Sequence, residues 1–206
     1  MEIQNKIIII PELISCMGDK IIITKEMIKK TEIFTDHYKK GIKRHLEEWR
    51  KAFLGKLAEY ATEVYFNNKF HNFFSPTKFD HELLYGDGGI DKICLKYSLS
   101  FDDKALLTRI KPDRKDQVVY FPDREKRGIK QELKADIYQV TEINVSLNED
   151  CSIKTNDDGS IHCKYLGYLT KYEVEWFCED SAYERFMKVE KMEALMKQKQ
   201  IGNSSV

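Results

Sequence analysis

The 206-residue sequence lacks the features of a membrane or secreted protein. It has no apolar run of 18 or more residues, the length that a membrane-spanning helix needs. Its first residues do not follow the basic, apolar, small-residue order of a secretory signal. Its five cysteines include no Cys-x-x-Cys pair, which gives little support to a disulfide framework or a structural zinc site. Scattered, reduced thiols are typical of an intracellular protein, and we expect a cytoplasmic location.

The sequence also lacks the motifs of several enzyme classes. It contains no Gly-x-Ser-x-Gly, Walker A or Gly-x-Gly-x-x-Gly motif, so serine-hydrolase and nucleotide-binding functions are unsupported. Its five histidines show neither His-x-His nor His-Glu-x-x-His spacing. The 34 basic residues are balanced by 34 acidic ones, so overall charge does not point to a nucleic-acid partner.

The composition and length predict one globular domain. Hydrophobic residues make up 42% of the chain and charged residues 33%, and 206 residues are enough to bury a core. We expect a single domain over residues 1–206. Within it we expect an N-terminal strand and extension at 1–32, a main core at 33–178, and a C-terminal helix with a frayed tail at 179–206.

Residue periodicity predicts a mixed α/β fold. Apolar residues at three- and four-residue spacing predict a helix from about Thr35 to Asn67, with a break near Gly41 or Gly55. Alternating and β-branched residues predict strands at Ile7–Ile10, Lys92–Phe101, Ala105–Lys111, Gln117–Phe121, Ala135–Val145, Ser152–Lys154 and Ile161–Leu169.

Turns and helix starts complete this prediction. Asp102-Asp103 is interpreted as a hairpin turn, and a second hairpin turn is expected at residues 156–159. Thr170 and Glu173 form a capping box that opens a short helix, and a charged helix is expected from Ser181 to Lys199. This order of elements favours a mixed central β-sheet flanked by helices.

Asp91 is the principal candidate for chemistry. It follows Gly88-Gly89, whose backbone freedom permits a tight turn and the close approach of a ligand. One or two carboxylates can hold Mg²⁺ for phosphodiester hydrolysis, and a nearby lysine can stabilise the developing charge. An ordinary turn with Asp91 as its polar edge residue is the alternative. Glu59 lies among small residues of the predicted helix and faces either the surface or a cleft.

Two stretches of the sequence resemble the opening of the PD-(D/E)xK, or restriction-endonuclease-like, nucleases. They are Gly-Lys-Leu-Ala-Glu-Tyr-Ala at 55–61 and Gly-Asp-Gly-Gly-Ile-Asp at 86–91. Residues 134–140 and 166–170 are similar to later core strands of that family, so the resemblance covers roughly residues 50–176. It implies a restriction-endonuclease-like core, Asp91 as metal ligand, Glu59 as an auxiliary acid and second ligand, and Mg²⁺ or Mn²⁺ as cofactor.

The family pattern also implies an acid-x-Lys motif on the next strand. Order and spacing place it at Arg109-Ile110-Lys111, where Lys111 matches the lysine but Arg109 stands in place of the acid. An arginine cannot coordinate a cation. Either another element, with Glu59 as the first candidate, supplies the second carboxylate, or the motif is Glu132-Leu133-Lys134 and the catalytic pair is Glu132 and Lys134.

A locally basic stretch supports a nucleic-acid partner. Residues 109–134 contain nine basic and five acidic side chains, which indicates either a solvated loop face or a phosphate track. The residues expected to bind DNA are Arg109, Arg114, Lys115, Arg124, Lys126 and Arg127.

Three functions are consistent with these patterns. The first is a metal-dependent deoxyribonuclease acting on DNA (or RNA), with no membrane association and with a homodimer formed through its N-terminal residues as one arrangement. The second is a catalytically impaired nucleic-acid-binding or assembly subunit of the same fold. The third is a protein-interaction module that uses the helical surface from Met187 to Met196.

Overall fold

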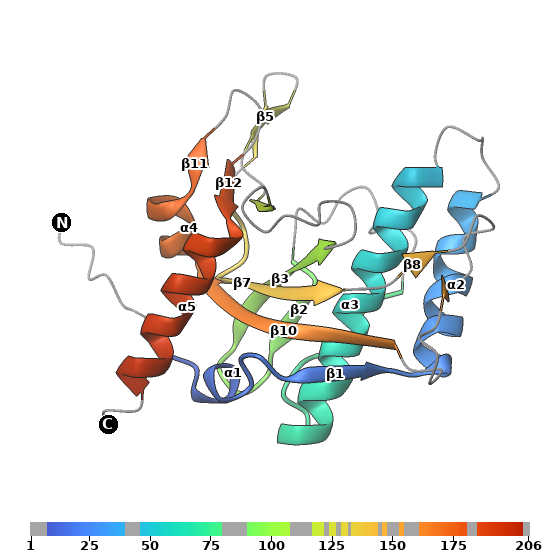
Figure 1. The fold of residues 1–206 in the computed structure, drawn as a ribbon, viewed down its shortest axis with the longest axis horizontal. Coiled ribbons are helices and arrows are strands. Elements are labelled where there is room, and N and C mark those ends of the chain that lie inside the picture. The colour runs from blue at the N-terminus through green and yellow to red at the C-terminus, as the bar shows by residue number, and fades with distance from the viewer. Residues whose placement is uncertain are drawn as a thin grey trace.

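A curled, mixed β-sheet flanked by helices forms the centre of the protein, which is a mixed α/β fold (Figure 1). None of the described helices is both long and apolar enough to cross a membrane. The computed structural model describes residues 8–39, 46–79, 90–107, 117–121, 124–126, 129–131, 133–143, 146–147, 153–154, 161–180 and 185–203.

The central sheet has the strand order β1-β10-β7-β3-β2. These strands are β1 (Lys20–Ile23), β10 (Ile161–Thr170), β7 (Ile137–Ile143), β3 (Leu99–Leu107) and β2 (Lys92–Cys94). Strands β3 and β7 run parallel, and the other neighbours pair antiparallel. The sheet is therefore mixed, with its parallel pair beside the short β2–β3 hairpin.

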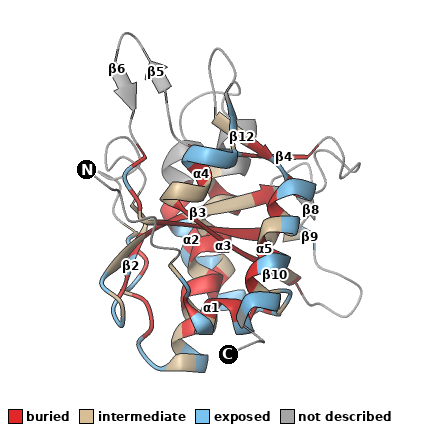
Figure 2. Cartoon of the chain, turned by 90° about the vertical axis from the view of Figure 1, so that its left-hand side faces the viewer, coloured by how far each residue is buried: buried red, intermediate tan, exposed pale blue. Residues whose placement is uncertain are grey.

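Helices cover both faces of this sheet. Helices α1 (Pro11–Ser15), α2 (Lys25–Lys39) and α3 (Leu46–Phe70) pack with one core, and α4 (Lys171–Phe177) and α5 (Val189–Asn203) pack with the other. Strand β7 serves both cores, because Ile137 and Ile143 belong to the α3 side and Tyr138 and Val140 to the α5 side. Figure 2 shows the buried residues concentrated along the sheet and on the helix surfaces that face it.

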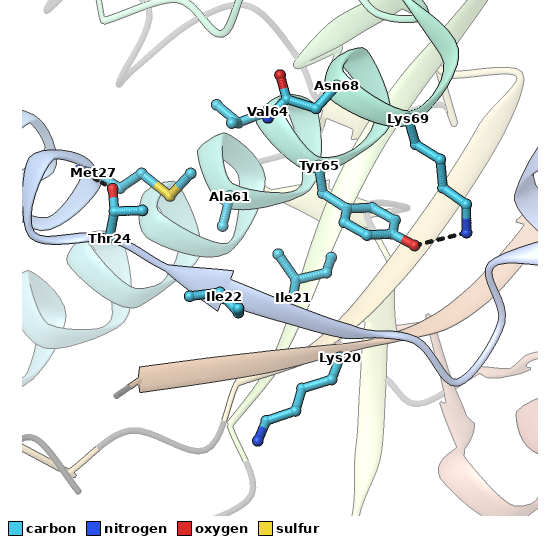
Figure 3. Close-up of a pocket in the computed structure, with 10 residues that line it drawn as sticks. All are labelled: Lys20, Ile21, Ile22, Thr24, Met27, Ala61, Val64, Tyr65, Asn68 and Lys69. Atoms are coloured by element: carbon cyan, nitrogen blue, oxygen red, sulfur yellow. Dashed lines mark hydrogen bonds between the residues drawn. The ribbon is translucent and has the colours of Figure 1, made fainter. Parts of the chain in front are cut away.

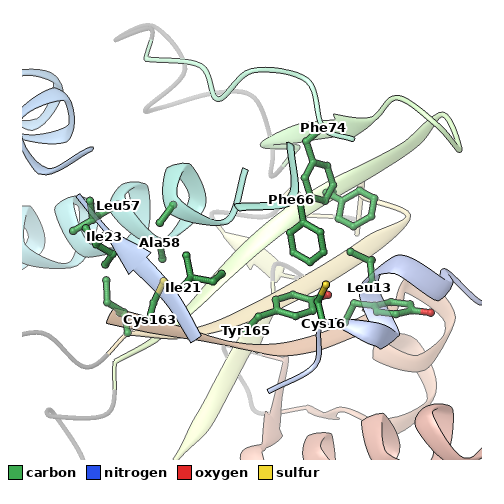
Figure 4. Close-up of a cluster of buried hydrophobic side chains, with 14 of the residues drawn as sticks. Leu13, Cys16, Ile21, Ile23, Leu57, Ala58, Phe66, Phe74, Cys163 and Tyr165 are labelled. Carbon is green, nitrogen blue, oxygen red and sulfur yellow. The ribbon is translucent and has the colours of Figure 1, made fainter. Parts of the chain in front are cut away.

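The core on the α3 side is aliphatic at one end and aromatic at the other (Figure 4). Leu57 and Ala58 of α3 lie near Ile21 and Ile23 of β1. Phe66, further along α3, makes edge contacts with surrounding rings, including Phe74 and Tyr165. This packing places α3 against β3, β7 and β1, and Glu59 lies on the buried surface of α3.

Three smaller sheets complete the described fold. Strands β11 (Glu179–Asp180), β12 (Arg185–Lys188) and β4 (Val118–Phe121) form a three-stranded sheet. Strands β5 (Arg124–Lys126) and β6 (Ile129–Gln131) pair with each other, as do β8 (Ser146–Leu147) and β9 (Ile153–Lys154).

Several predicted elements are confirmed. The long strand expected at Ala135–Val145 is β7, the short strand at Gln117–Phe121 is β4, and Thr170 with Glu173 forms the capping box of α4. The helix expected from Thr35 to Asn67, with a break near Gly41 or Gly55, is wrong in extent, because α2 begins at Lys25 and α3 runs from Leu46 to Phe70. Residue 41 lies outside the described residues, and α3 continues through Gly55.

Three other predictions are wrong. Residues 8–10 are not a strand, since they lead into α1, whose first turn accommodates Pro11. Strand β9 pairs with β8 rather than with β10, which is held between β7 and β1. The C-terminal helix begins at Val189 and reaches Asn203, because residues 185–188 pair with β4 as a strand.

The position of the β2–β3 hairpin matters most for function. The sequence placed its turn at Asp102-Asp103, but β2 ends at Cys94 and the turn occupies residues 95–98, with Ser98 at a positive φ of 55°. Asp102 and Asp103 lie in the middle of β3 instead. Acidic residues disfavour strands, and neighbouring lysines offset that preference here.

Candidate active site

Asp91 is fixed at the start of the β2–β3 hairpin by two backbone contacts. Its own N–H donates to the carbonyl of Phe101 at 2.8 Å, and its Oδ2 accepts the backbone N–H of Asp103 at 2.7 Å. Asp91 is half-buried, so its carboxylate lies between the solvent and the interior. The hairpin therefore presents a partly accessible carboxylate held by the backbone.

Glu59 of α3 contributes a buried carboxylate to the same region. Only 4% of Glu59 is exposed, and Lys56, one turn earlier, contacts Glu59 Oε2 at 2.5 Å. Burial, followed by the negative charge of Asp91, raises the pKa of Glu59 to about 8, against the opposing effect of Lys56. The charge of Asp91 therefore acts on the helix acid Glu59, which was predicted from the sequence as its auxiliary acid.

Strand β3 adds two further acids on opposite faces. Lys92 Nζ lies 2.8 Å from Asp103 Oδ2, and Lys104 Nζ lies 2.6 Å from Asp102 Oδ1. Burial raises the pKa of Asp102 to about 7, and it also raises the pKa of Asp103. In both cases the lysine opposes the shift and the charge of Asp91 adds to it.

We call this group the Asp91 cluster and define it by Glu59, Asp91, Asp102 and Asp103 together with Lys56, Lys92 and Lys104. Its centre is Asp91, whose charge raises the pKa of each of the other three acids. The four acids and three lysines bring seven ionisable groups together in a largely buried place. Burial favours the neutral forms of Glu59, Asp102 and Asp103, and the lysines oppose this.

Lys92 is the most deeply buried cation of the cluster. Its side chain has no exposed surface, and its ammonium lies 4.5 Å from the centre of the Phe74 ring as well as beside Asp103. The ring and the carboxylate together replace part of the hydration that the ammonium loses. A buried cation is thus held next to the acids from which metal-dependent chemistry is expected.

The carboxylate oxygens of the cluster fit a hard cation in their chemistry. Glu59 Oε1, Asp102 Oδ2 and Asp103 Oδ1 are buried without a hydrogen-bond partner, whereas Asp103 Oδ2 is paired with Lys92. Mg²⁺ and Mn²⁺ favour carboxylate oxygens as ligands. Among the described residues, no three His, Cys, Asp or Glu side chains converge as ligands of one ion. The donor set therefore suits an ion held by one or two carboxylates and water.

The structure describes only part of the predicted site. It places Glu59 and Asp91 in one electrostatic cluster, and Lys134 is exposed just before β7. The side chains of Arg124 and Lys126 on β5 lie outside the described part, as do the remaining predicted residues, Arg109, Lys111, Arg114, Lys115, Arg127 and Glu132.

Sequence reasoning missed the acids of β3 and the lysines paired with the cluster. A signal for them exists, because Asp102-Asp103-Lys104 is itself an acid-x-Lys string that begins eleven positions after Asp91. Interpreting Asp102-Asp103 as a turn hid it. No family model, curated protein or solved structure matches the chain.

Proposed function

We propose that the protein is a Mg²⁺- or Mn²⁺-dependent nuclease that hydrolyses phosphodiester bonds in DNA, with a restriction-endonuclease-like core. The observation that carries this proposal is the 2.7 Å hydrogen bond from the Asp103 N–H to Asp91 Oδ2, which places Asp91 beside the acids of β3. The charge of Asp91 also raises the pKa of Glu59 on α3. A helix glutamate, an aspartate and an acid on the following strand are the acids that the family resemblance implies.

The acid-x-Lys motif of this proposal is Asp102-Asp103-Lys104. It lies on β3, the strand that follows Asp91 and pairs with β2. Asp102 and Lys104 share one face of the strand and contact each other at 2.6 Å. With this motif, no acid is required at the position of Arg109. We assign the role of the motif's lysine to Lys104 rather than to Lys111 or Lys134.

Each group has a defined role in this proposal. Asp91 with Asp102 or Asp103 would hold the cation, which supplies charge neutralisation and a more acidic water. Lys104, whose side chain is 21% exposed, provides positive charge for the phosphoryl oxygens, while Lys92 is fully buried and balances the charge of Asp103. Glu59, with a pKa of about 8, can exchange a proton with water near neutral pH.

Cleavage assays with single-stranded, double-stranded and branched DNA in Mg²⁺ or Mn²⁺ test the proposal. Asp91→Asn and Lys104→Gln should each abolish cleavage, while Lys164→Gln on the exposed face of β10 serves as a matched lysine control. Cleavage retained in Asp91→Asn would contradict the proposal. If Lys111→Gln abolishes cleavage and Lys104→Gln does not, the lysine of the motif is Lys111. If Lys134→Gln abolishes cleavage and Lys104→Gln does not, the motif is Glu132-Leu133-Lys134.

A second candidate function is a nucleic-acid-binding or assembly subunit without catalysis. It is favoured by the lysines of the cluster, since Lys56, Lys92 and Lys104 each contact a carboxylate that a cation would otherwise use. This candidate predicts DNA binding that weakens steeply with salt, without cleavage in either metal. Measuring binding by fluorescence anisotropy in the same buffers separates the two functions.

A further inference from the structure

The two edges of the central sheet differ in how they are covered. Residues Phe73–Ser75 lie along β2, where Ser75 N–H donates to Ile93 at 2.8 Å and Leu95 N–H donates to Phe73 at 2.9 Å. Strand β1, at the other edge, pairs with β10, and no other described strand pairs with it. Within the described part of the chain, the β1 edge is therefore open for pairing.

The hydrogen-bond pattern identifies which groups of β1 face outward. Tyr165 N–H donates to the carbonyl of Asp19 at 3.0 Å, so the Asp19 carbonyl faces β10. Successive residues of an antiparallel ladder alternate in this respect. Lys20 and Ile22 consequently direct their N–H and C=O groups toward the open edge, where an added strand can bond to them.

A groove of about 670 Å³ follows this edge (Figure 3). Ile21, which is buried, and Ile22, which is 65% exposed, both line it although their side chains leave opposite faces of β1. This is expected only if the groove passes beside the strand. Its other wall belongs to α2 and α3 and is formed by Met27, Ala61, Val64, Tyr65, Asn68 and Lys69.

The charges around the groove favour an acidic occupant. Among its described lining residues, Lys20 and Lys69 carry charge and none is acidic. Asp19 contacts Lys69 at 3.0 Å and also accepts a short hydrogen bond from Tyr65, so Lys20 supplies the net positive charge at this end. The remaining lining is mostly apolar, which suits an aliphatic side chain in the middle of the groove.

We infer that the β1 edge binds an extended peptide segment of another protein, which adds a strand to the sheet. The segment places an aliphatic residue against Ala61 and Val64 and an acidic residue beside Lys20, while its backbone bonds to Lys20 and Ile22. A second copy of β1 fits less well, because its Ile21 and Ile23 are already buried beneath its own α3. This inference does not depend on the proposed nuclease activity.

A labelled peptide of alternating valine and threonine, ending in two glutamates, is a direct probe. The full chain should bind it, while the same peptide ending in two lysines should bind at least about fivefold more weakly. A peptide with N-methyl groups on alternate amides should not bind, because its backbone donors are blocked. Fluorescence anisotropy measures all three affinities, and failure of the glutamate peptide to bind would overturn the inference.

Substitutions at Ile22 locate the binding to the open edge. Ile22→Pro removes a donor that the β10 ladder does not use, and edge strands tolerate proline at such positions. It should weaken peptide binding about tenfold, whereas Ile22→Thr, which keeps the N–H, should change it less than about twofold. Equal affinity in both variants, or self-association of the chain that Ile22→Pro abolishes, would overturn the inference. Should Ile22→Pro fail to fold, the N-methylated peptide gives the same test on the unchanged chain.

Discussion

Two regions of the molecule each bury lysine beside acid, but they differ in how the carboxylate oxygens are used. In the Lys199 corner, defined by Tyr168, Thr170, Glu173 and Lys199, Glu173 Oε2 accepts from Thr170 N–H, Thr170 Oγ1 and Lys199 Nζ at 2.7, 3.0 and 2.6 Å. Lys199 also donates to the Tyr168 carbonyl at 2.9 Å. In the Asp91 cluster, three carboxylate oxygens (Glu59 Oε1, Asp102 Oδ2 and Asp103 Oδ1) are buried without any hydrogen bond.

This difference separates a structural ion pair from a candidate site. The Lys199 corner is complete, because its carboxylate caps α4 and its ammonium joins α5 to β10. The Asp91 cluster is incomplete without a ligand, since unsatisfied buried carboxylates are costly and raise one another's pKa. Substitutions in the Lys199 corner should therefore change mainly the stability of the fold. Substitutions in the Asp91 cluster should change how that stability depends on divalent metal and on pH.

The largest effect is expected from breaking the Lys199 corner. Lys199→Ala should lower the free energy of unfolding by about 3 kcal/mol, because it leaves Glu173 charged without its buried partner. Urea denaturation at pH 7 measures this. Lys197→Ala, on the exposed part of the same helix, should change stability by less than about 0.5 kcal/mol. A loss below about 1 kcal/mol for Lys199→Ala would show that the corner contributes no more than a surface pair.

The next effect concerns the pH dependence that Glu59 confers. The pKa of Glu59 is about 8 in the folded protein, against 4.5 for an ordinary solvated glutamate. The folded state therefore binds the proton more tightly than the unfolded state, and the stability of the fold decreases as the pH rises from 4.5 to 8. Glu59→Gln should therefore be about 2 kcal/mol more stable than the parent at pH 9 and nearly equal to it at pH 5.

Urea denaturation at both pH values checks this prediction. Glu190→Gln, an exposed acid of α5, is the matched control and should leave the pH dependence unchanged. If Glu59→Gln and the parent lose stability in parallel between pH 5 and pH 9, burial does not raise the pKa of Glu59.

A divalent cation should stabilise the cluster without affecting the corner. At a concentration tenfold above its dissociation constant, Mg²⁺ or Mn²⁺ should raise the free energy of unfolding by about 1.4 kcal/mol. Thermal unfolding with and without metal detects this change. The increase should persist in Lys199→Ala and vanish in Asp91→Asn, and an increase that survives in Asp91→Asn would place the ion elsewhere.

The smallest effect is a gain in stability from Asp91→Asn, the substitution proposed to abolish cleavage. Asp91→Asn keeps an oxygen to accept the Asp103 N–H but removes the charge that raises three neighbouring pKa values. Without metal at pH 8 it should stabilise the fold by about 1 kcal/mol, as measured by urea denaturation. A loss of more than about 1 kcal/mol would mean that Asp91 serves mainly as a structural cap of the hairpin.

The sequence predicted local features better than their pairing. Alternation identified β7, and the Thr170–Glu173 spacing identified a cap, because both depend on residues that are near in the chain. The partner of β9 and the extent of α3 depend on distant packing, which one sequence does not reveal. Glu59 and Asp91 were predicted through the family motif. Asp102-Asp103 was misinterpreted as a turn although Lys104 follows it directly, because its pairing with Lys92 is recognisable only in three dimensions.

Strand β7 has a consequence for how the molecule opens. Because its alternate side chains belong to the α3 core and the α5 core, neither core can come apart alone without exposing apolar surface of the other. The two halves should therefore unfold in a single cooperative transition. Amide hydrogens of β7 are expected to exchange with solvent only through that global event, while the outward-facing amides of β1, which no described strand pairs, exchange without any opening.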